Sequence, residues 1–117
     1  MVVVGLSLST PSLLRAQLAS QNTARTLFNE GRDLWDEGKF VDAERKFREA
    51  LTKYPKAEQS DRTAYYLITT LVTLGRTSEA RMEIDNFNRN YPQSRWKSDV
   101  EEKRLAISGL PSIQWGQ

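Results

Sequence analysis

One stretch of the chain combines basic and aromatic side chains at a spacing that could recognise an anion. Phe28, Arg32 and Trp35 follow one another at intervals of four and three residues, so they lie on one side of an α-helix. A guanidinium one turn from each ring can stack on an aromatic face and still pair with a carboxylate. The alternative is that a neighbouring helix covers the two rings as part of the core.

Adjacent acidic residues are the other candidates for chemistry. The segments WDEGK (residues 35–39) and DVEEKR (99–104) each contain neighbouring carboxylates. Glycoside hydrolysis needs two carboxylates on opposite sides of a bound sugar. Adjacent acids in a helix instead share a solvated face, and no second element places a substrate between them. We therefore expect no catalytic residue in either segment.

Several kinds of site are excluded by composition. The chain has no histidine and no cysteine, which removes disulfides, thiolate nucleophiles, Cys/His metal sites and the usual general base. Its six glycines are scattered, so no phosphate-binding loop is present. The sequence predicts a protein that is not an enzyme and holds no metal and no cofactor.

Charge and length indicate a single soluble domain. The chain has 117 residues, 38% hydrophobic and 27% charged, with a mean hydropathy of -0.61, which favours a folded helical protein. The net charge is only +2, so the sequence pI near 9.0 does not indicate nucleic-acid binding. The run ERKFR, Glu44 to Arg48, interleaves acids with bases, and we expect it to form a charged outer helix face.

Apolar periodicity predicts five helical segments. Helices are expected from Thr23 to Gly38 and from Phe40 to Tyr54, then two more that end at Gly75 and Pro92, and a closing helix over 94–108. A glycine directly after the last periodic residue takes the left-handed conformation that ends a helix. The short connection at Gly38 forces the flanking helices to run antiparallel.

The pattern repeats at a fixed interval. Gly38 and Gly75, Ala43 and Ala80, and Pro55 and Pro92 are each separated by 37 residues. Two helices per unit at such a period are typical of a solenoid. The sequence therefore predicts an all-α fold of antiparallel helix hairpins with about two and a half repeats: unit one at 23–55, unit two at 60–92 and the closing helix.

These residues resemble the tetratricopeptide repeat. The signature positions matched in unit one are Leu27, Gly31, Leu34, Gly38, Phe40, Ala43, Phe47, Ala50 and Pro55, and those in unit two are Ala64, Leu71, Gly75, Ala80, Ile84 and Pro92. Three departures, Ile68, Thr77 and Phe87, predict looser packing in unit two. The Tyr-Pro helix ends and the long period are similar to the bacterial cell-envelope branch, which includes Tol-Pal accessory and outer-membrane assembly proteins.

The resemblance implies a concave groove, lined by the first helix of each unit, that binds a peptide or helix of a partner protein. It assigns eight residues to this groove: Arg25, Phe28, Arg32 and Trp35 from unit one, and Arg62, Tyr65, Thr69 and Val72 from unit two. An aromatic floor with an arginine rim suits an acidic or carboxylate-bearing peptide.

Both ends of the chain differ from the repeats. Residues 1–21 contain an apolar run from Val2 to Leu8 and only one charge, which indicates a signal peptide, although Met1 could be an internal residue of a longer leader. The alternative is a small N-terminal helix capped by Thr10, with Pro11 in its first turn. Residues 109–117, with Ile113 and Trp115, are predicted to be a tail or linker.

The leading hypothesis is a non-enzymatic protein-interaction module of the periplasm or a secreted protein, with no nucleic-acid partner and no membrane span after leader removal; a cytoplasmic location is the alternative. A second hypothesis is self-association, because a short solenoid exposes its ends. The chain could also be the N-terminal fragment of a larger repeat protein.

Overall fold

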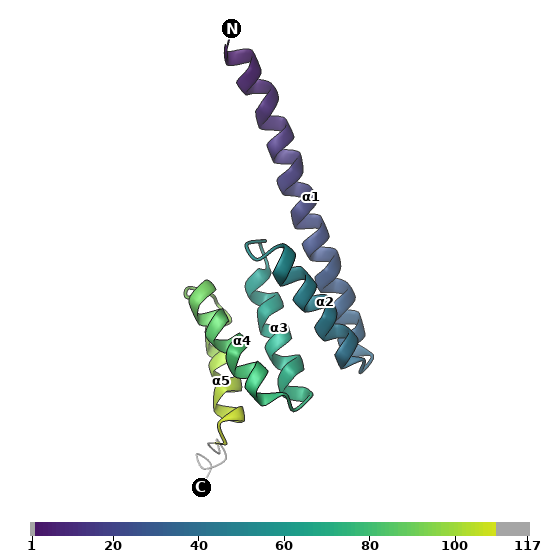
Figure 1. The fold of residues 1–117 in the computed structure, drawn as a ribbon, viewed down its shortest axis with the longest axis vertical. Coiled ribbons are helices and arrows are strands. Elements are labelled where there is room, and N and C mark those ends of the chain that lie inside the picture. The colour runs from purple at the N-terminus through teal and green to yellow at the C-terminus, as the bar shows by residue number, and fades with distance from the viewer. Residues whose placement is uncertain (1, 110–117) are drawn as a thin grey trace.

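The computed structural model describes residues 2–109, with side chains from residue 11 onward, and these residues form five α-helices and no strand. The helices are α1 (Val2–Asp36), α2 (Phe40–Lys53), α3 (Ser60–Thr73), α4 (Thr77–Asn90) and α5 (Lys97–Ile107). The helices α1 and α2 form one antiparallel hairpin, α3 and α4 form the next, and α5 packs against both helices of the second (Figure 1). The predicted all-α fold of helix hairpins is confirmed.

The turn inside each hairpin depends on a glycine. Gly38 and Gly75 have φ angles of 80° and 75°, in the left-handed region that favours glycine. The Gly38 N–H donates to the Trp35 carbonyl at 3.0 Å, and the Lys39 N–H donates to the Leu34 carbonyl at 2.8 Å. The same pair of bonds recurs around Gly75. This arrangement ends a helix by satisfying its last carbonyls, so the glycines act as predicted.

The core of the first hairpin is centred on Phe47, which is fully buried. Its ring lies against Gly31 of α1, where a Cβ atom would come within 2.6 Å of Phe47 Cε1. The two helices can approach this closely only because Gly31 has no side chain. The other buried members of this cluster are Phe28, Ala43, Leu67, Leu71 and Ala80.

A second buried cluster joins α3, α4 and α5. Ile68 and Phe87 are 0% and 1% exposed, and they pack with Ala64, Ile84 and Val100. Both side chains are therefore buried, and the looser packing of unit two stays a prediction. The larger side chains fill space that α5 encloses, since Val100 of α5 is itself fully buried.

The first helix is longer than predicted. It has 35 residues and contains Pro11, so it extends about 52 Å at 1.5 Å per residue. No helix begins at Thr10 or at Thr23, because the chain is already helical before both. Residues 11–20 are all exposed, and this part of α1 projects beyond the other helices (Figure 1). The boundary between leader and repeat domain stays a prediction.

The last helix presents a largely polar outer surface. Ser98, Glu101 and Glu102 of α5 are exposed, together with Leu105 and Ala106. The predicted tail residues Ile113 and Trp115 lie outside the described residues.

Candidate partner-binding face

The eight residues predicted to line a groove all lie on α1 and α3, which pack side by side. Phe28 is only 3% exposed and belongs to the core, so the core alternative holds for this ring. Arg25 is exposed, and the other six are half-buried: Arg32, Trp35, Arg62, Tyr65, Thr69 and Val72. Their role in binding stays a prediction.

The centre of this face is Tyr66, which the sequence analysis did not select. Its ring lies 5.2 Å from the Phe28 ring and 6.2 Å from the Trp35 ring, measured between centroids. The guanidinium carbons of Arg32 and Arg62 lie 5.3 and 5.9 Å from the Tyr66 centroid. Arg62 also lies 4.6 Å from the Phe28 centroid. Two cations therefore converge on one aromatic ring.

These two cations have few anionic partners within the described residues. Arg32 has a single contact with Asp36 at 3.9 Å, between exposed groups. Arg62 makes no ion pair with any described residue, and it donates to the side-chain oxygen of Gln59 at 3.3 Å. Surface pairs of this kind contribute little, so neither guanidinium at Tyr66 is held in a strong ion pair with a described residue.

Two polar atoms beside Tyr66 are buried without a hydrogen-bond partner among the described residues. They are Trp35 Nε1 and Thr69 Oγ1, and Thr69 lies about one turn after Tyr66 on α3. A buried donor without an acceptor costs about 1 to 3 kcal/mol. Such groups are rare in native structures and call for an explanation at each site.

Tyr65 points toward the closing helix instead of standing free. Its ring stacks on Trp96, directly before α5, with centroids 4.9 Å apart and an angle of 22° between the planes. Arg95 lies 5.9 Å from the Trp96 centroid. This stack continues the arginine and aromatic pattern from α1 and α3 to the start of α5.

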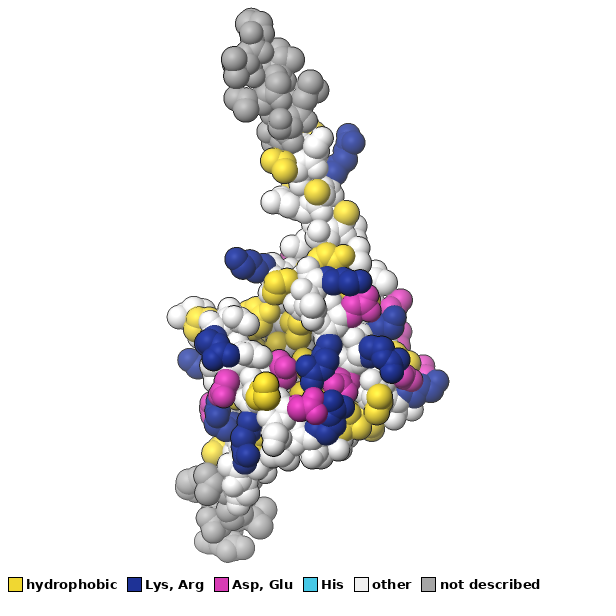
Figure 2. Space-filling view, viewed as in Figure 1, with side chains coloured by type: hydrophobic (Ala, Val, Ile, Leu, Met, Phe, Trp, Pro, Cys, Tyr) yellow, Lys and Arg dark blue, Asp and Glu magenta, His cyan; other side chains and the backbone are white. Residues whose placement is uncertain are grey.

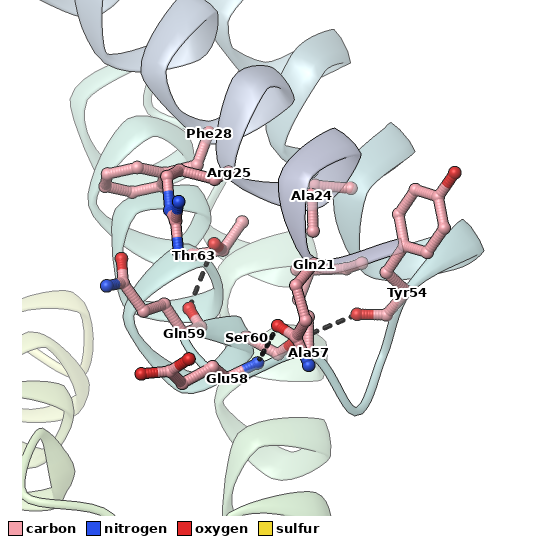
Figure 3. Close-up of a pocket in the computed structure, with 12 residues that line it drawn as sticks. Gln21, Ala24, Arg25, Phe28, Tyr54, Ala57, Glu58, Gln59, Ser60 and Thr63 are labelled. Atoms are coloured by element: carbon pink, nitrogen blue, oxygen red, sulfur yellow. Dashed lines mark hydrogen bonds between the residues drawn. The ribbon is translucent and has the colours of Figure 1, made fainter. Parts of the chain in front are cut away.

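A small cavity lies beneath this face, between α1 and the loop that joins α2 to α3 (Figure 3). Its volume is about 20 Å³, which suffices for about one water molecule. Gln21 closes one side, since its Oε1 atom accepts the Glu58 N–H at 2.8 Å. We interpret the cavity as a packing feature that ties α1 to the loop.

A network of ion pairs links the second helices of the two units. Glu44 of α2 accepts hydrogen bonds from Arg48 at 2.7 Å and from Arg76, and Arg48 reaches Glu79 at 3.1 Å and Glu83 at 3.2 Å. Glu44 is 7% exposed, so the prediction of a solvated outer face is wrong at this residue. Burial alone would raise the pKa of Glu44, but the bonds from Arg48 and Arg76 outweigh it and hold that pKa below its usual value of 4.5.

Replacing Glu44 by glutamine should lower the free energy of unfolding by about 1 to 2 kcal/mol. Breaking a fully buried pair costs about 3 to 5 kcal/mol, and here water reaches both guanidiniums, which reduces the loss. Because the pKa of Glu44 is lowered in the folded state, its ion pairs stabilise the fold above pH 4.5. This stabilisation is lost as the pH falls below that value. Thermal melts from pH 7 to 3 should therefore show the variant and the parent converging in acid.

The control for this prediction is Glu49→Gln. Glu49 is on the same helix but pairs only with Lys53, four residues away and near the surface. We expect its melting temperature at pH 7 to stay close to that of the parent. An equal loss in both variants would contradict a special role for Glu44.

The acidic segments lie at the surface. Asp36 and Glu37 are exposed and contact Arg32 and Lys39, and Glu101 contacts Arg104. Within the described part of the chain, no group of three or more acidic side chains is placed to hold a metal ion. These carboxylates act as partners of nearby basic side chains.

Comparison with known protein families gives a match over most of the chain. A family model described as YfiO, outer membrane lipoprotein, matches residues 20–101, well over half of the chain. No curated protein gives a significant match. Over the residues that the structure describes, no helix is both long and apolar enough to cross a membrane. The chain belongs to the YfiO family of outer membrane lipoproteins, in agreement with the predicted resemblance to tetratricopeptide proteins of the cell envelope.

Proposed function

We propose that residues 23–108 form a non-enzymatic interaction module of the cell envelope, which binds an acidic segment of a partner protein around Tyr66. The observation that carries the proposal is the convergence of Arg32 and Arg62 on one ring. Both guanidiniums lie within 5.9 Å of the same ring centroid, so an acidic segment that reaches this ring could form a charge-assisted hydrogen bond with either of them. Each guanidinium carries five N–H donors, which can pair with a carboxylate.

The buried polar atoms support the same proposal. Trp35 Nε1 is a donor only, so it requires an acceptor. An acidic segment that displaces neighbouring side chains would bring carboxylate or carbonyl oxygens to Trp35 and Thr69. The cost of leaving these atoms unpaired in the free protein would then be recovered on binding.

Binding of labelled model peptides tests this function. The probe is a hexapeptide of alternating glutamate and leucine, and its counterpart has glutamine in place of glutamate. We expect the glutamate peptide to bind at least tenfold more tightly in fluorescence anisotropy. Arg32→Gln and Arg62→Gln should each weaken binding about fivefold, because loss of one partly exposed charge-assisted hydrogen bond costs about 1 kcal/mol.

The matched control is Arg45→Gln. Arg45 is an exposed arginine of α2 that pairs with Asp42 and has no contact with Tyr66. Equal affinity for the two peptides would contradict the proposal. So would a loss of affinity in Arg45→Gln as large as that in Arg32→Gln and Arg62→Gln.

The localisation that best fits this module is the periplasmic side of the envelope, with the first residues acting as a leader that is removed. Three observations support a leader that ends near Ala19. Residues 11–20 are exposed, the family match begins at residue 20, and, from residue 11 onward, Gln21 is the first side chain with a hydrogen bond to the α2–α3 loop. Small residues at Ala16, Ala19 and Ser20 suit a signal peptidase.

Intact-mass measurement of the protein from its native host should therefore find an N-terminus between Ala16 and Gln21. A chain that begins at Ser20 should melt within about 2 °C of the longer one, since residues 11–19 are all exposed. A chain that begins at Thr26 loses Gln21 and Ala24 and should melt clearly lower. Recovery of the protein from the cytosol with residues 1–19 still attached would contradict the leader.

A further inference from the structure

A row of aromatic rings continues from the face around Tyr66 to the start of α5. Tyr65 and Tyr66 are neighbours on α3, and their ring centroids lie 5.8 Å apart. Trp35 of α1 lies 6.2 Å from Tyr66, and Trp96, directly before α5, lies 4.9 Å from Tyr65. The rings of α1, of α3 and of the residue before α5 therefore form one connected row.

Trp96 is held in place by the loop that leads into α5. The Ser94 hydroxyl donates to Asp61 Oδ2 at 2.6 Å, and Ser94 Oγ accepts the Trp96 N–H at 3.0 Å. Asp61 Oδ1 accepts the Arg62 N–H at 2.8 Å, so both oxygens of this carboxylate are engaged. Together with the stack on Tyr65, these bonds fix the Trp96 ring in the free protein, which lowers the entropy cost of binding a partner.

Two arginines beside this row have no anionic partner. Arg95 is exposed, and its guanidinium carbon lies 5.9 Å from the Trp96 centroid. Neither Arg62 nor Arg95 makes an ion pair within the part of the chain that the structure describes. By contrast, the arginines of the ion-pair network pair with glutamates, and Figure 2 shows basic and acidic side chains side by side over α2 and α4. Arg62 and Arg95 are therefore available to an anionic partner.

An open hollow joins these two arginines. Its volume is about 430 Å³, and its lining residues are Glu58, Gln59, Asp61, Arg62, Arg95 and Trp96. A carboxylate in this hollow can accept charge-assisted hydrogen bonds from the guanidiniums. Glu58 is exposed and carries the same charge as such a ligand, so it limits how many carboxylates the hollow can take.

We propose that Arg95 and Trp96 form a second subsite for the acidic partner segment and take its second carboxylate. This subsite rests on the proposed function, because the first carboxylate binds at Tyr66. Neighbouring packed helices are about 8–10 Å apart, and an extended segment advances about 3.3 Å per residue. Two carboxylates about three positions apart therefore reach both subsites, whereas adjacent carboxylates do not.

Three labelled heptapeptides test this subsite on the full chain. One has a single glutamate, one has two glutamates three positions apart, and one has two adjacent glutamates, with glycine and leucine elsewhere. In fluorescence anisotropy we expect the spaced pair to bind at least threefold more tightly than the adjacent pair, which has the same net charge. Arg95→Gln should make these two affinities equal. Glu58→Gln should strengthen binding of the spaced pair about twofold, because it removes a like charge.

The matched control is Arg89→Gln, which should keep the preference for the spaced pair. Arg89 is exposed near the end of α4 and bonds to Asn86. Fluorine NMR of the chain labelled with 5-fluorotryptophan gives a second readout, with the Trp96 resonance assigned from Trp96→Phe. The spaced pair should shift this resonance, and the peptide with a single glutamate should not.

Two outcomes separate the subsite from the proposed function. If Arg32→Gln weakens binding of all three peptides but the spaced and adjacent pairs bind the unchanged chain equally, the subsite is absent and the proposed function stands. If no glutamate peptide binds better than its glutamine counterpart, both are wrong. Tighter binding when lysine replaces the second glutamate would also overturn the subsite, since Glu58 would then select the charge of the partner.

Discussion

Replacing Gly31 by leucine is expected to lower the free energy of unfolding by about 3 kcal/mol or more. A Cβ atom at this position would lie 2.6 Å from Phe47 Cε1 and 2.8 Å from Phe47 Cδ1. Phe47 is fully buried and packs on the rings of Phe28 and Tyr66 at 5.8 and 5.9 Å, so its ring has no free space to enter. The added side chain must therefore push α1 and α2 apart.

Chemical denaturation of three further variants tests this explanation. Asn29→Leu adds the same side chain at an exposed position of α1 and should change stability little. In Gly31→Ala, the steric contact with Phe47 is partly offset by a gain of about 1 kcal/mol in helix propensity. The loss of stability should therefore be much smaller than for leucine. Combining Gly31→Ala with Phe47→Leu should be less damaging than the sum of the single changes, because the smaller residue relieves the contact. Equal stability of Gly31→Leu and Asn29→Leu would show that the two helices do not meet at Gly31.

The hairpins were predictable because their signals are local. A left-handed glycine, a small alanine and a closing proline fix where each helix ends and how closely the next one returns. These signals recur after 37 residues, and this interval predicted the repeat. The continuity of α1 was not predictable in this way. Between Pro11 and Thr23 the chain consists mainly of residues that tolerate a helix, so nothing local marks where one helix stops and another starts.

The candidate site was predictable only in part. Helical spacing predicted that Phe28, Arg32 and Trp35 share one side of α1, because it depends only on positions within one helix, and the role of the eight groove residues in binding stays a prediction. Which neighbour covers each ring depends on the register between α1 and α3, which is set by long-range packing. In the structure, Arg62 and Tyr66 lie against the Phe28 ring, and the Tyr65 ring stacks on Trp96. The sequence did contain a signal for Tyr66. Tyr66 follows Arg62 by four residues, and the same spacing separates Phe28 from Arg32.

The ion-pair network between the units was not foreseen for the same reason. The sequence from Glu44 to Arg48 predicts pairing within one helix, and the structure has this contact between Glu44 and Arg48. The partners Arg76, Glu79 and Glu83 come from the next unit. Their approach depends on how far α4 stands from α2, and a pattern within one helix does not contain that distance.

Replacing Ala43 or Ala80 by leucine is the second change with a large expected effect, about 1 to 3 kcal/mol of lost stability for each. Both alanines are 0% exposed, and each occupies the first turn of the second helix in its unit, where its N–H bonds to the residue before that helix. Since the hairpin is tightest there, three added carbons have no space. In a domain of this size, 1 kcal/mol corresponds to about 4 to 8 °C in melting temperature.

The control is Ala57→Leu, in the loop between α2 and α3, where the side chain is only half-buried and we expect a small change. Because Ala43 and Ala80 are equivalent positions 37 residues apart, their two losses should be similar in size, which distinguishes a repeat from two unrelated hairpins. If Ala43→Leu and Ala57→Leu both melt with the parent, the assigned hairpin and repeat register are wrong. The face around Tyr66 would then lose its basis too, because its residues from α1 and α3 come together only in that register.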